Sequence, residues 1–388
     1  PAGGAVIPLS LRVLSIDGLA EPCPDSIAQR TVLLAASSPS QLDSIDWQPA
    51  SHALVALAQI SPDAAANVLG VHAMSPERFV RAYAARAAGI IGERTVLSAL
   101  LQDPIPNVRT EALRGLAKLD DQALDAAAIN QLVVEDPQLI MAATAVLEGS
   151  TNPGAAPALA DALDRMSKEG RETFRDARRA LLERLEELGD SGLSERLLPY
   201  LSDYDQLVAQ DAARVLESWN GKAYFPNPTP KRVLALPTIE QLREMAVSIV
   251  VLHMQRGGEI HIELHPYVST ANTWRFFTQV REGYFDGLTF HRWSPNFVIQ
   301  GGSPNANEYY GSGPFSRDEV GMHHWQGTVG ISTRGHDTGD GQIFVNLLDN
   351  ARLDHQYTII GTVTEGLEVV GLVNEGDVIE RAEVRLSH

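Results

Sequence analysis

The chain has 388 residues, 44% of them hydrophobic, and a formal net charge of −18, a length that favours two or three domains. So acidic a chain lacks the basic surface that phosphate neutralisation needs, which excludes nucleic acid as an expected partner. Its single cysteine, Cys23, excludes an internal disulfide and a cysteine metal cluster. No run of about 18 apolar residues occurs, so no transmembrane segment is expected.

The N-terminal stretch 1–24 is expected to be an extension outside the folded domains. It starts with Pro1 rather than methionine, from which we expect that a leader, tag or longer N-terminal part has been removed. Residues 1–11 have neither the basic start nor the long apolar core of a signal peptide.

Residues 25–220 consist of short helical segments that are rich in alanine and leucine and are separated by Pro, Gly, Asp and Asn. Similar helix starts recur about every 30 residues, near residues 49, 77, 106, 137, 171 and 203. In 107–117 the apolar residues recur at intervals of three and four, the period of an amphipathic helix. Helix pairs at this interval predict an α-solenoid, in which each pair buries its apolar face against its neighbours.

The repeated pattern of Asp-Pro, then Val-Arg, then alanines resembles HEAT-type repeats, most clearly in 103–119. An irregular all-α domain is the alternative. The region contains no paired carboxylates or clustered histidines that indicate chemistry. We therefore expect it to present an extended surface to a protein partner.

Residues 221–245 are expected to form a proline-rich linker followed by a short helix. Four prolines between residues 226 and 237 disfavour helix and favour an extended connection. The helix is predicted over 238–245, with Thr238 as its N-cap and Gln241 completing a capping box.

After this helix the apolar period changes from that of a helix to that of a strand. Residues 247–253 and 259–265 are predicted strands joined by a hairpin turn, and 270–280 is a predicted helix. Short strands punctuated by glycine follow to the end of the chain. Many short strands with few helices predict a closed antiparallel β-barrel, so the whole chain is expected to be a multidomain α + β protein.

One stretch of this second half, 290–302, places an arginine, an apolar pair and an amide close together. Alternating side chains of an extended segment share a face, so Arg292 and Gln300 are expected on one side across a turn at 294–295. Phe297 and Val298 supply an apolar floor between them. This combination suits a neutral, partly apolar ligand. The alternative is a half-buried strand with a turn and a surface salt bridge.

Three blocks of the second half, 290–302, 327–345 and 353–361, resemble the cyclophilin family of peptidyl-prolyl cis/trans isomerases in order and spacing. The resemblance covers residues 246–388. It implies an eight-stranded antiparallel barrel with two helices, isomerase activity on proline-containing protein or peptide clients, and no cofactor.

The resemblance also implies the site residues. Arg292 matches the catalytic arginine, and Gln300 and Phe344 belong to the same catalytic group. The positions that match substrate-binding residues are Phe297, Val298, Ser332, Gln342, Arg352, Leu353 and Tyr357. Four of these depart from the usual family residue, because Arg352 replaces a tryptophan, Val298 a methionine, Ser332 an alanine and Tyr357 a histidine. The change at Arg352 puts strong cyclosporin binding in doubt.

The chemistry of these residue types agrees with this assignment. Rotation about an Xaa–Pro bond needs no nucleophile and no proton transfer, only a donor for the proline nitrogen as its lone pair develops. Arg292 suits that task because a guanidinium is always charged and has a fixed shape.

Two histidine patterns offer metal sites as alternatives. His261, Glu263 and His265 alternate along one predicted strand and could share a face, but we expect a solvated barrel face there. His323 and His324 are neighbours whose side chains should point apart in a strand. We therefore expect no metal.

The expected function is a prolyl isomerase that helps protein folding, with the HEAT-like repeats as a protein-binding scaffold. The alternative is a catalytically weak cyclophilin that serves as a proline-peptide-binding or adaptor subunit of a larger complex. The expected compartment is the bacterial envelope or periplasm, with the cytoplasm as the alternative.

Overall fold

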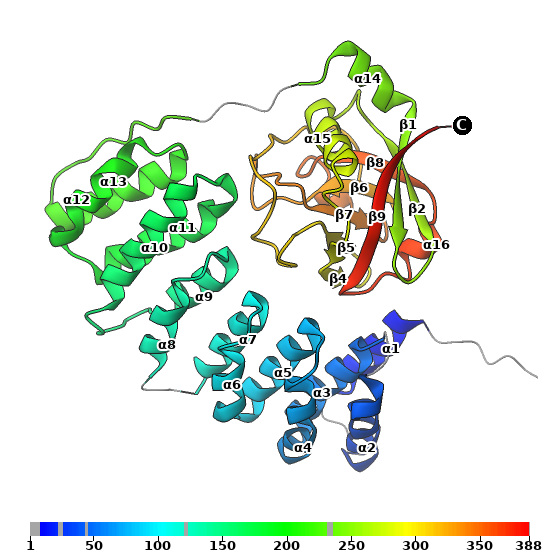
Figure 1. The fold of residues 1–388 in the computed structure, drawn as a ribbon, viewed down its shortest axis with the longest axis horizontal. Helices are drawn as coiled ribbons and strands as arrows, with labels where there is room; N and C mark the ends of the chain where they lie inside the picture. The colour runs from blue at the N-terminus through cyan, green and yellow to red at the C-terminus, as the bar shows by residue number, and fades with distance from the viewer. Residues whose placement is uncertain (1–7, 22–25, 43–45, 120–122, 231–235, 388) are drawn as a thin grey trace, which may run out of the picture. The chain divides into compact units, whose positions relative to one another are not determined.

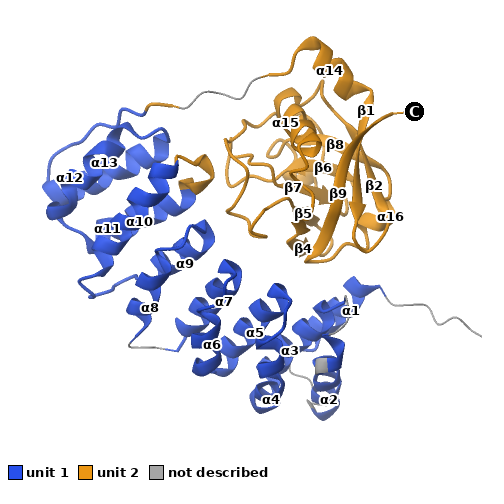
Figure 2. Cartoon of the chain, viewed as in Figure 1, with its two compact units in different colours: residues 1–169, 176–228 blue, residues 170–175, 229–388 orange. Residues whose placement is uncertain are grey.

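The computed structural model describes residues 8–21, 26–42, 46–119, 123–230 and 236–387 (Figure 1). They belong to two compact units, residues 1–169 with 176–228 and residues 170–175 with 229–388 (Figure 2). Expectations about Pro1, Cys23 and part of the linker, 231–235, lie outside the described residues. Within the described ranges, no helix is long and apolar enough to span a membrane.

The first unit is built from helices, as predicted. Their bounds are α1 Leu9–Gly18, α2 Ser26–Ala36, α3 Gln48–Ile60, α4 Pro62–Ala73, α5 Arg78–Ile91, α6 Arg94–Leu100, α7 Pro106–Leu116, α8 Leu124–Gln131, α9 Pro137–Val146, α10 Ala155–Glu169, α11 Arg175–Leu188, α12 Ser194–Leu197 and α13 Gln206–Asn220.

The helix starts follow from local residue chemistry. Prolines occupy the first turn of α3, α4, α7 and α9, where the missing backbone donor would lack a partner in any case. The side chain of Asp136 caps α9 and that of Asp205 caps α13 by accepting from backbone N–H groups. At the other end, Gly92 and Gly221 adopt the left-handed conformation that closes α5 and α13.

Helices of this unit pack on their near neighbours in sequence, α3 on α5, α5 on α7 and α7 on α9. Gly89 and Gly115 let α5 and α7 approach so closely that a Cβ on Gly89 would lie 2.8 Å from Gly115 Cα. Between α11 and the start of α13, Arg178 Nη1 donates to Asp203 Oδ2 at 2.8 Å, and the Arg178 side chain is fully buried.

The second unit contains a curled antiparallel sheet and the α-helices α14 Ile239–Ala246, α15 Thr270–Arg281 and α16 Leu367–Val370. Its strands are β1 Ser248–Met254, β2 Glu259–Leu264, β3 Thr289–Phe290, β4 Arg292–Ser294, β5 Val298–Gly301, β6 Thr328–Ile331, β7 Ile343–Asn346, β8 Ile359–Glu365 and β9 Asp377–Leu386. The predicted capping box at the start of α14 is present, because Gln241 N donates to Thr238 Oγ1 and Thr238 N donates to Gln241 Oε1.

Among the described residues the sheet has nine strands, where eight were expected. Their order is β3-β9-β1-β2-β8-β6-β7-β5-β4, so the first and last strands of the order are adjacent in the sequence. Only His291 separates β3 from β4, so the segment 289–294 supplies two strands. The sheet therefore curls back on the same segment, 289–294, and forms a nearly closed barrel.

Along β5 and β7 successive side chains point to opposite faces of the sheet, and the apolar ones therefore belong to two different clusters. Ile299, Ile343 and Val345 join the main core, which also contains the phenylalanines of α15. Val298 and Phe344 instead belong to a small separate cluster with Leu353. Because successive side chains of a strand point to opposite faces, the strands that complete the core also carry a second apolar surface.

Candidate functional site

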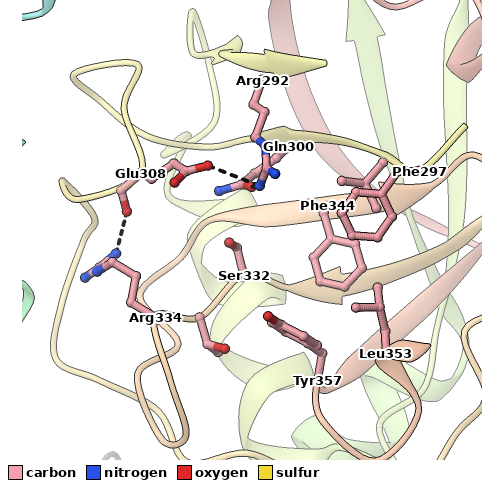
Figure 3. Close-up of a pocket in the computed structure, with 11 residues that line it drawn as sticks. Arg292, Phe297, Gln300, Glu308, Ser332, Arg334, Phe344, Leu353 and Tyr357 are labelled. Carbon is pink, nitrogen blue, oxygen red and sulfur yellow. Dashed lines mark hydrogen bonds and ion pairs between the residues drawn. The ribbon is translucent and has the colours of Figure 1, made fainter. Parts of the chain in front are cut away.

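The apolar surface formed by Val298, Phe344 and Leu353 is one side of a pocket of about 180 Å³ (Figure 3). The side chains that line it come from β4, β5 and β7 and from the segments that connect β4 to β5, β5 to β6, β6 to β7 and β7 to β8. They are Arg292, Phe297, Val298, Gln300, Glu308, Ser332, Thr333, Arg334, Phe344, Leu353 and Tyr357.

The floor of the pocket is apolar. Val298, Phe344 and Leu353 form it, flanked by Phe297 and Tyr357. The rings of Phe344 and Tyr357 meet edge to face, with centroids 5.8 Å apart at 88°, an arrangement that aromatic pairs favour. This floor offers a flat, rigid contact for a small apolar ring.

Space for the Phe344 ring depends on a glycine of the neighbouring strand. Gly330 in β6 pairs with Phe344 in β7, and a Cβ on Gly330 would lie 2.4 Å from Phe344 Cζ. A glycine within a strand often marks such a close approach. Gly330 thus lets the ring lie flat over the strand.

The other end of the pocket is polar. Arg292 in β4 lies directly opposite Gln300 in β5 in the strand register, so the prediction that they share one side is confirmed. Arg292 Nη1 donates to Gln300 Oε1 at 3.1 Å and lies 3.1 Å from Glu308 Oε1. In Figure 3 these three side chains face the apolar floor across the pocket. The site therefore combines an oriented guanidinium with an apolar surface.

Gln342 lies behind this polar end rather than in the pocket lining. It is buried, accepts from Gln300 Nε2 at 3.2 Å, and donates to the Glu308 carbonyl oxygen at 3.1 Å. One amide thus holds both partners of Arg292, Gln300 by its side chain and Glu308 by its backbone.

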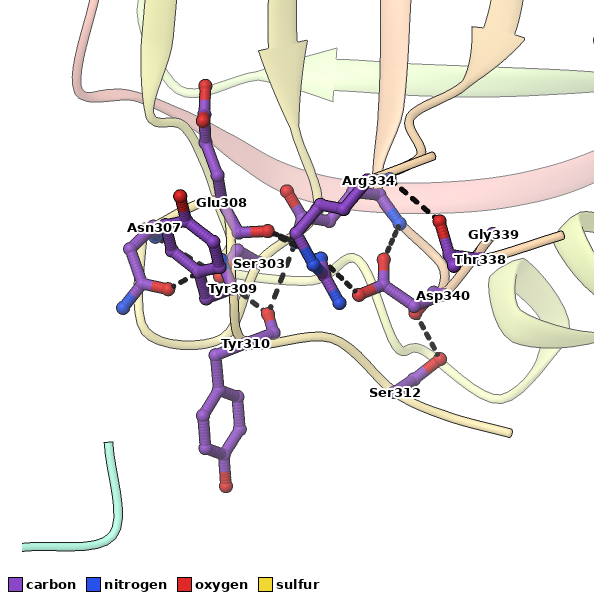
Figure 4. Close-up of polar contacts among 12 residues, drawn as sticks. Ser303, Asn307, Glu308, Tyr309, Tyr310, Ser312, Arg334, Thr338, Gly339 and Asp340 are labelled. Atoms are coloured by element: carbon purple, nitrogen blue, oxygen red, sulfur yellow. Dashed lines mark hydrogen bonds and ion pairs between the residues drawn. The ribbon is translucent and has the colours of Figure 1, made fainter. Parts of the chain in front are cut away.

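A polar network fixes the loop that carries Glu308 (Figure 4). Arg334 Nη1 donates to the Glu308 carbonyl oxygen at 2.6 Å and to Asp340 Oδ2 at 2.9 Å. Asp340 is fully buried; burial raises the pKa of its carboxyl, while the charge of Arg334 opposes that rise. Ser312 Oγ and backbone N–H both donate to the Asp340 carbonyl oxygen. The network holds the Glu308 loop against the strand ends.

Arg352 lies at the edge of the pocket, outside its lining. Its guanidinium carbon is 4.0 Å from the centroid of the Phe297 ring, a distance at which a cation is attracted to an aromatic face. Phe297 therefore packs against the pocket floor and also stacks with the Arg352 guanidinium.

The pocket brings together eight of the ten residues that the sequence analysis assigned to the site, and places Gln342 behind it and Arg352 at its edge. Sequence reasoning missed Glu308, Thr333 and Arg334. These three lie in loops after β5 and β6, and neither strand alternation nor the family motifs single them out.

The histidines considered for metal binding have other neighbours. His261 Nε2 lies 2.8 Å from Glu259 Oε2, and His265 Nε2 lies 2.8 Å from Thr362 Oγ1. His323 contacts Asp354 at 2.7 Å, whereas the ring of His324 stacks on Phe344. Within the described parts of the chain, no group of three His, Cys, Asp or Glu residues is placed to hold a metal ion.

Comparison with known proteins identifies similar chains. The family model for cyclophilin type peptidyl-prolyl cis-trans isomerase/CLD matches residues 249–387. Peptidyl-prolyl cis-trans isomerase B of Bacillus subtilis is 34% identical over 134 residues, which cover 34% of this chain and 94% of that protein. A peptidyl-prolyl cis-trans isomerase of Helicobacter pylori is 35% identical, over 35% of this chain and 87% of that protein.

A third similar protein joins a related domain to repeats. The mouse peptidylprolyl isomerase domain and WD repeat-containing protein 1 is 32% identical over 149 residues, which cover 37% of this chain and 23% of that protein.

Proposed function

Because the chain belongs, through residues 249–387, to the cyclophilin-type peptidyl-prolyl cis-trans isomerase family, we propose that Arg292 is the catalytic residue of this pocket. The observation that carries the proposal is the position of its guanidinium, fixed between Gln300 and Glu308 at one end of an apolar floor. A proline ring fits that floor, and its nitrogen then faces the guanidinium.

The energetics of the reaction match such a site. Resonance imposes a barrier of about 18–20 kcal/mol on rotation about a peptide bond, although the cis and trans forms of Xaa–Pro differ by only about 0.5–1 kcal/mol. As the bond twists, resonance is lost and the proline nitrogen gains a lone pair. Arg292 donates to that nitrogen, which stabilises the twisted state more than either planar state and so lowers the barrier.

The remaining residues bind and orient the substrate. Phe297, Val298, Phe344 and Leu353 hold the proline ring still, so that rotation takes place on the acyl side of the bond. Gln300 binds the moving carbonyl oxygen through its amide. Gln342 acts as a positioning residue, because it reaches the substrate only through Gln300 and Glu308. Side chains of this chain fill each of these roles.

The test of the catalytic assignment is Arg292→Ala, measured on a short Ala-Pro peptide in a coupled-protease assay. We expect kcat/KM to fall at least about tenfold, a loss of about 1.4 kcal/mol of transition-state stabilisation, with an unchanged thermal unfolding temperature. Arg281→Ala is the matched control, because that arginine lies at the end of α15 and pairs with Glu244. A folded Arg292→Ala protein with the wild-type rate would refute the assignment.

We further propose that the helical unit is a HEAT-type solenoid that holds protein clients for the barrel. Helix pairs packed on their neighbours, the close α5–α7 contact and the buried Arg178–Asp203 pair support it, since each is a contact between successive repeats. The test compares the full chain with residues 229–388 on a protein whose refolding is limited by proline isomerisation. The full chain should be faster on that protein and equal on a short peptide; equal rates on both would contradict the scaffold role.

An adaptor with little catalysis is the second candidate, and the observation that favours it is Arg352 in place of the usual tryptophan. On this account the wild type binds proline peptides without accelerating their isomerisation, and binding survives Arg292→Ala. A wild-type rate above the uncatalysed rate would exclude this candidate.

A further inference from the structure

Each charged side chain that lines the pocket has a partner of opposite charge, which for Arg292 is Glu308 of the lining and for Arg334 is the buried Asp340. Arg292 Nη1 lies 3.1 Å from Glu308 Oε1, and Arg334 Nη1 lies 2.9 Å from Asp340 Oδ2. Each pair brings one positive and one negative charge together, so the lining as a whole is close to neutral. A charge preference for substrates has to come from the edge of the pocket.

Arg352 is the charged residue at that edge. It is exposed and stacks on the ring of Phe297, a residue that also lines the pocket. In the described parts of the chain the Arg352 guanidinium makes no ion pair within 4 Å and no hydrogen bond.

The two carboxylates nearest to Arg352 in the sequence, Asp349 and Asp354, accept hydrogen bonds from groups other than Arg352. Asp354 accepts from the backbone N–H of His324 at 2.8 Å and contacts His323 at 2.7 Å, and these contacts lower the pKa of the Asp354 carboxyl. Asp349 accepts from the backbone N–H of Gln326 at 2.8 Å. The donors of the Arg352 guanidinium are therefore left for a bound molecule.

We propose that Arg352 makes this isomerase prefer substrates with an acidic residue next to the proline, an inference that rests on the proposed function. A proline on the floor contacts Phe297, so the flanking residue passes the guanidinium stacked on the same ring. Stacking holds the guanidinium plane, and a planar fork of donors matches a carboxylate in two parallel hydrogen bonds.

The net charge of −18 does not oppose this preference. In physiological salt, exposed charges more than about 8 Å apart are largely screened. The electrostatic free energy of binding a substrate carboxylate at Arg352 therefore depends on that contact rather than on the distant acidic surface. The same screening predicts that the preference weakens as salt concentration rises.

The experiment measures isomerisation by NMR exchange spectroscopy, which needs no helper protease with a sequence preference of its own. Short peptides carry Glu, Gln or Lys before the proline and, in a second set, after it. The full-length wild type is compared with Arg352→Gln, and Arg281→Gln serves as the control for losing one positive charge elsewhere in the barrel unit.

We expect the wild type to isomerise the Glu peptide of one set with a kcat/KM about threefold or more above that of the Lys peptide, the size expected for an exposed ion pair. In Arg352→Gln this ratio should fall to about one, while Arg281→Gln keeps the wild-type ratio. Equal wild-type rates on Glu, Gln and Lys peptides, or a ratio that survives Arg352→Gln, would overturn this inference alone. A wild type that accelerates none of the peptides would overturn the proposed function itself.

Discussion

Each unit of the molecule contains an arginine paired with a carboxylate, and the two pairs differ in exposure. In the helical unit the side chain of Arg178 is 0% exposed and that of its partner Asp203 is 6% exposed. In the barrel the side chains of Arg292 and Glu308 are 44% and 43% exposed. The donor–acceptor distances are similar, 2.8 Å and 3.1 Å, so distance alone does not separate the roles of the two pairs.

Exposure separates them. A buried pair cannot meet a substrate, and removing one partner leaves an uncompensated charge in the protein interior. A half-exposed pair contributes little to stability, because water screens it, and its guanidinium is accessible to a ligand. We therefore assign Arg178 to the packing of α11 against the start of α13, and Arg292 to the chemistry of the pocket.

The largest effect expected from this comparison is on stability. Arg178→Ala should lower the free energy of unfolding of the helical unit by about 3–5 kcal/mol, because it leaves Asp203 buried without its cation. Urea unfolding followed by far-UV circular dichroism measures the change. Arg179→Ala is the control, since Arg179 is 43% exposed and pairs with Asp211, and it should cost about 1 kcal/mol or less. Equal losses in the two variants would contradict the account.

The second largest effect is expected from replacing a glycine in the barrel, compared with the same replacement in the helical unit. Gly330→Ala should destabilise the barrel by about 1–3 kcal/mol through overpacking and raise KM, because its Cβ would displace the Phe344 ring. Gly70→Ala in α4 is the matched control, since a Cβ there meets no atom within 4 Å. Thermal unfolding and peptide kinetics test both. A Gly330→Ala protein with wild-type KM would show that the position of Phe344 does not matter.

A smaller effect is expected at the partner of the catalytic arginine. Glu308→Gln keeps the size of the side chain but removes the charge that helps to orient Arg292. We expect kcat/KM to fall about threefold, the scale of an exposed ion pair, with stability unchanged. Steady-state kinetics at low and high salt measure this. A faster variant would mean that Glu308 restrains the guanidinium instead of orienting it.

The smallest effect is a pH dependence of barrel stability. Burial lowers the pKa of His324, whose ring stacks on Phe344, below its usual 6.5. Below that value the unfolded chain binds more protons than the folded one, so stability is complete above about pH 6.5 and falls as the pH drops through the folded-state pKa.

His324→Asn should reduce this loss. We expect the difference in urea midpoint between pH 7.5 and pH 5.5 to be smaller in the variant than in the wild type. The helical unit contains a buried histidine of its own, His72, whose pKa is also lowered by burial. The measurement therefore follows the tryptophan fluorescence of the barrel with residues 229–388. An identical pH dependence in both proteins would remove His324 as its source.

Much of the fold could be predicted because it depends on local periodicity. The helix starts at α7 and α9, the capping box at Thr238 and the facing positions of Arg292 and Gln300 follow from residue type and spacing. The strand count could not be predicted, because the break at His291 depends on how the sheet curls back on itself.

The loop residues of the site were also beyond sequence reasoning. Glu308 reaches Arg292 because Arg334, Gln342 and buried Asp340 hold its loop. These contacts join segments about thirty residues apart and follow no period. The position of Arg352 at the pocket edge likewise depends on the turn that stacks it on Phe297.

The most direct test of the account is one isomerisation assay on an Ala-Pro peptide with wild type, Arg292→Ala and Arg178→Ala, at a temperature where all three are folded. The account predicts that Arg292→Ala loses at least about tenfold in kcat/KM while Arg178→Ala keeps the wild-type value despite its lower stability. A folded Arg292→Ala protein with full activity, or an Arg178→Ala protein that loses as much activity as Arg292→Ala, would contradict it.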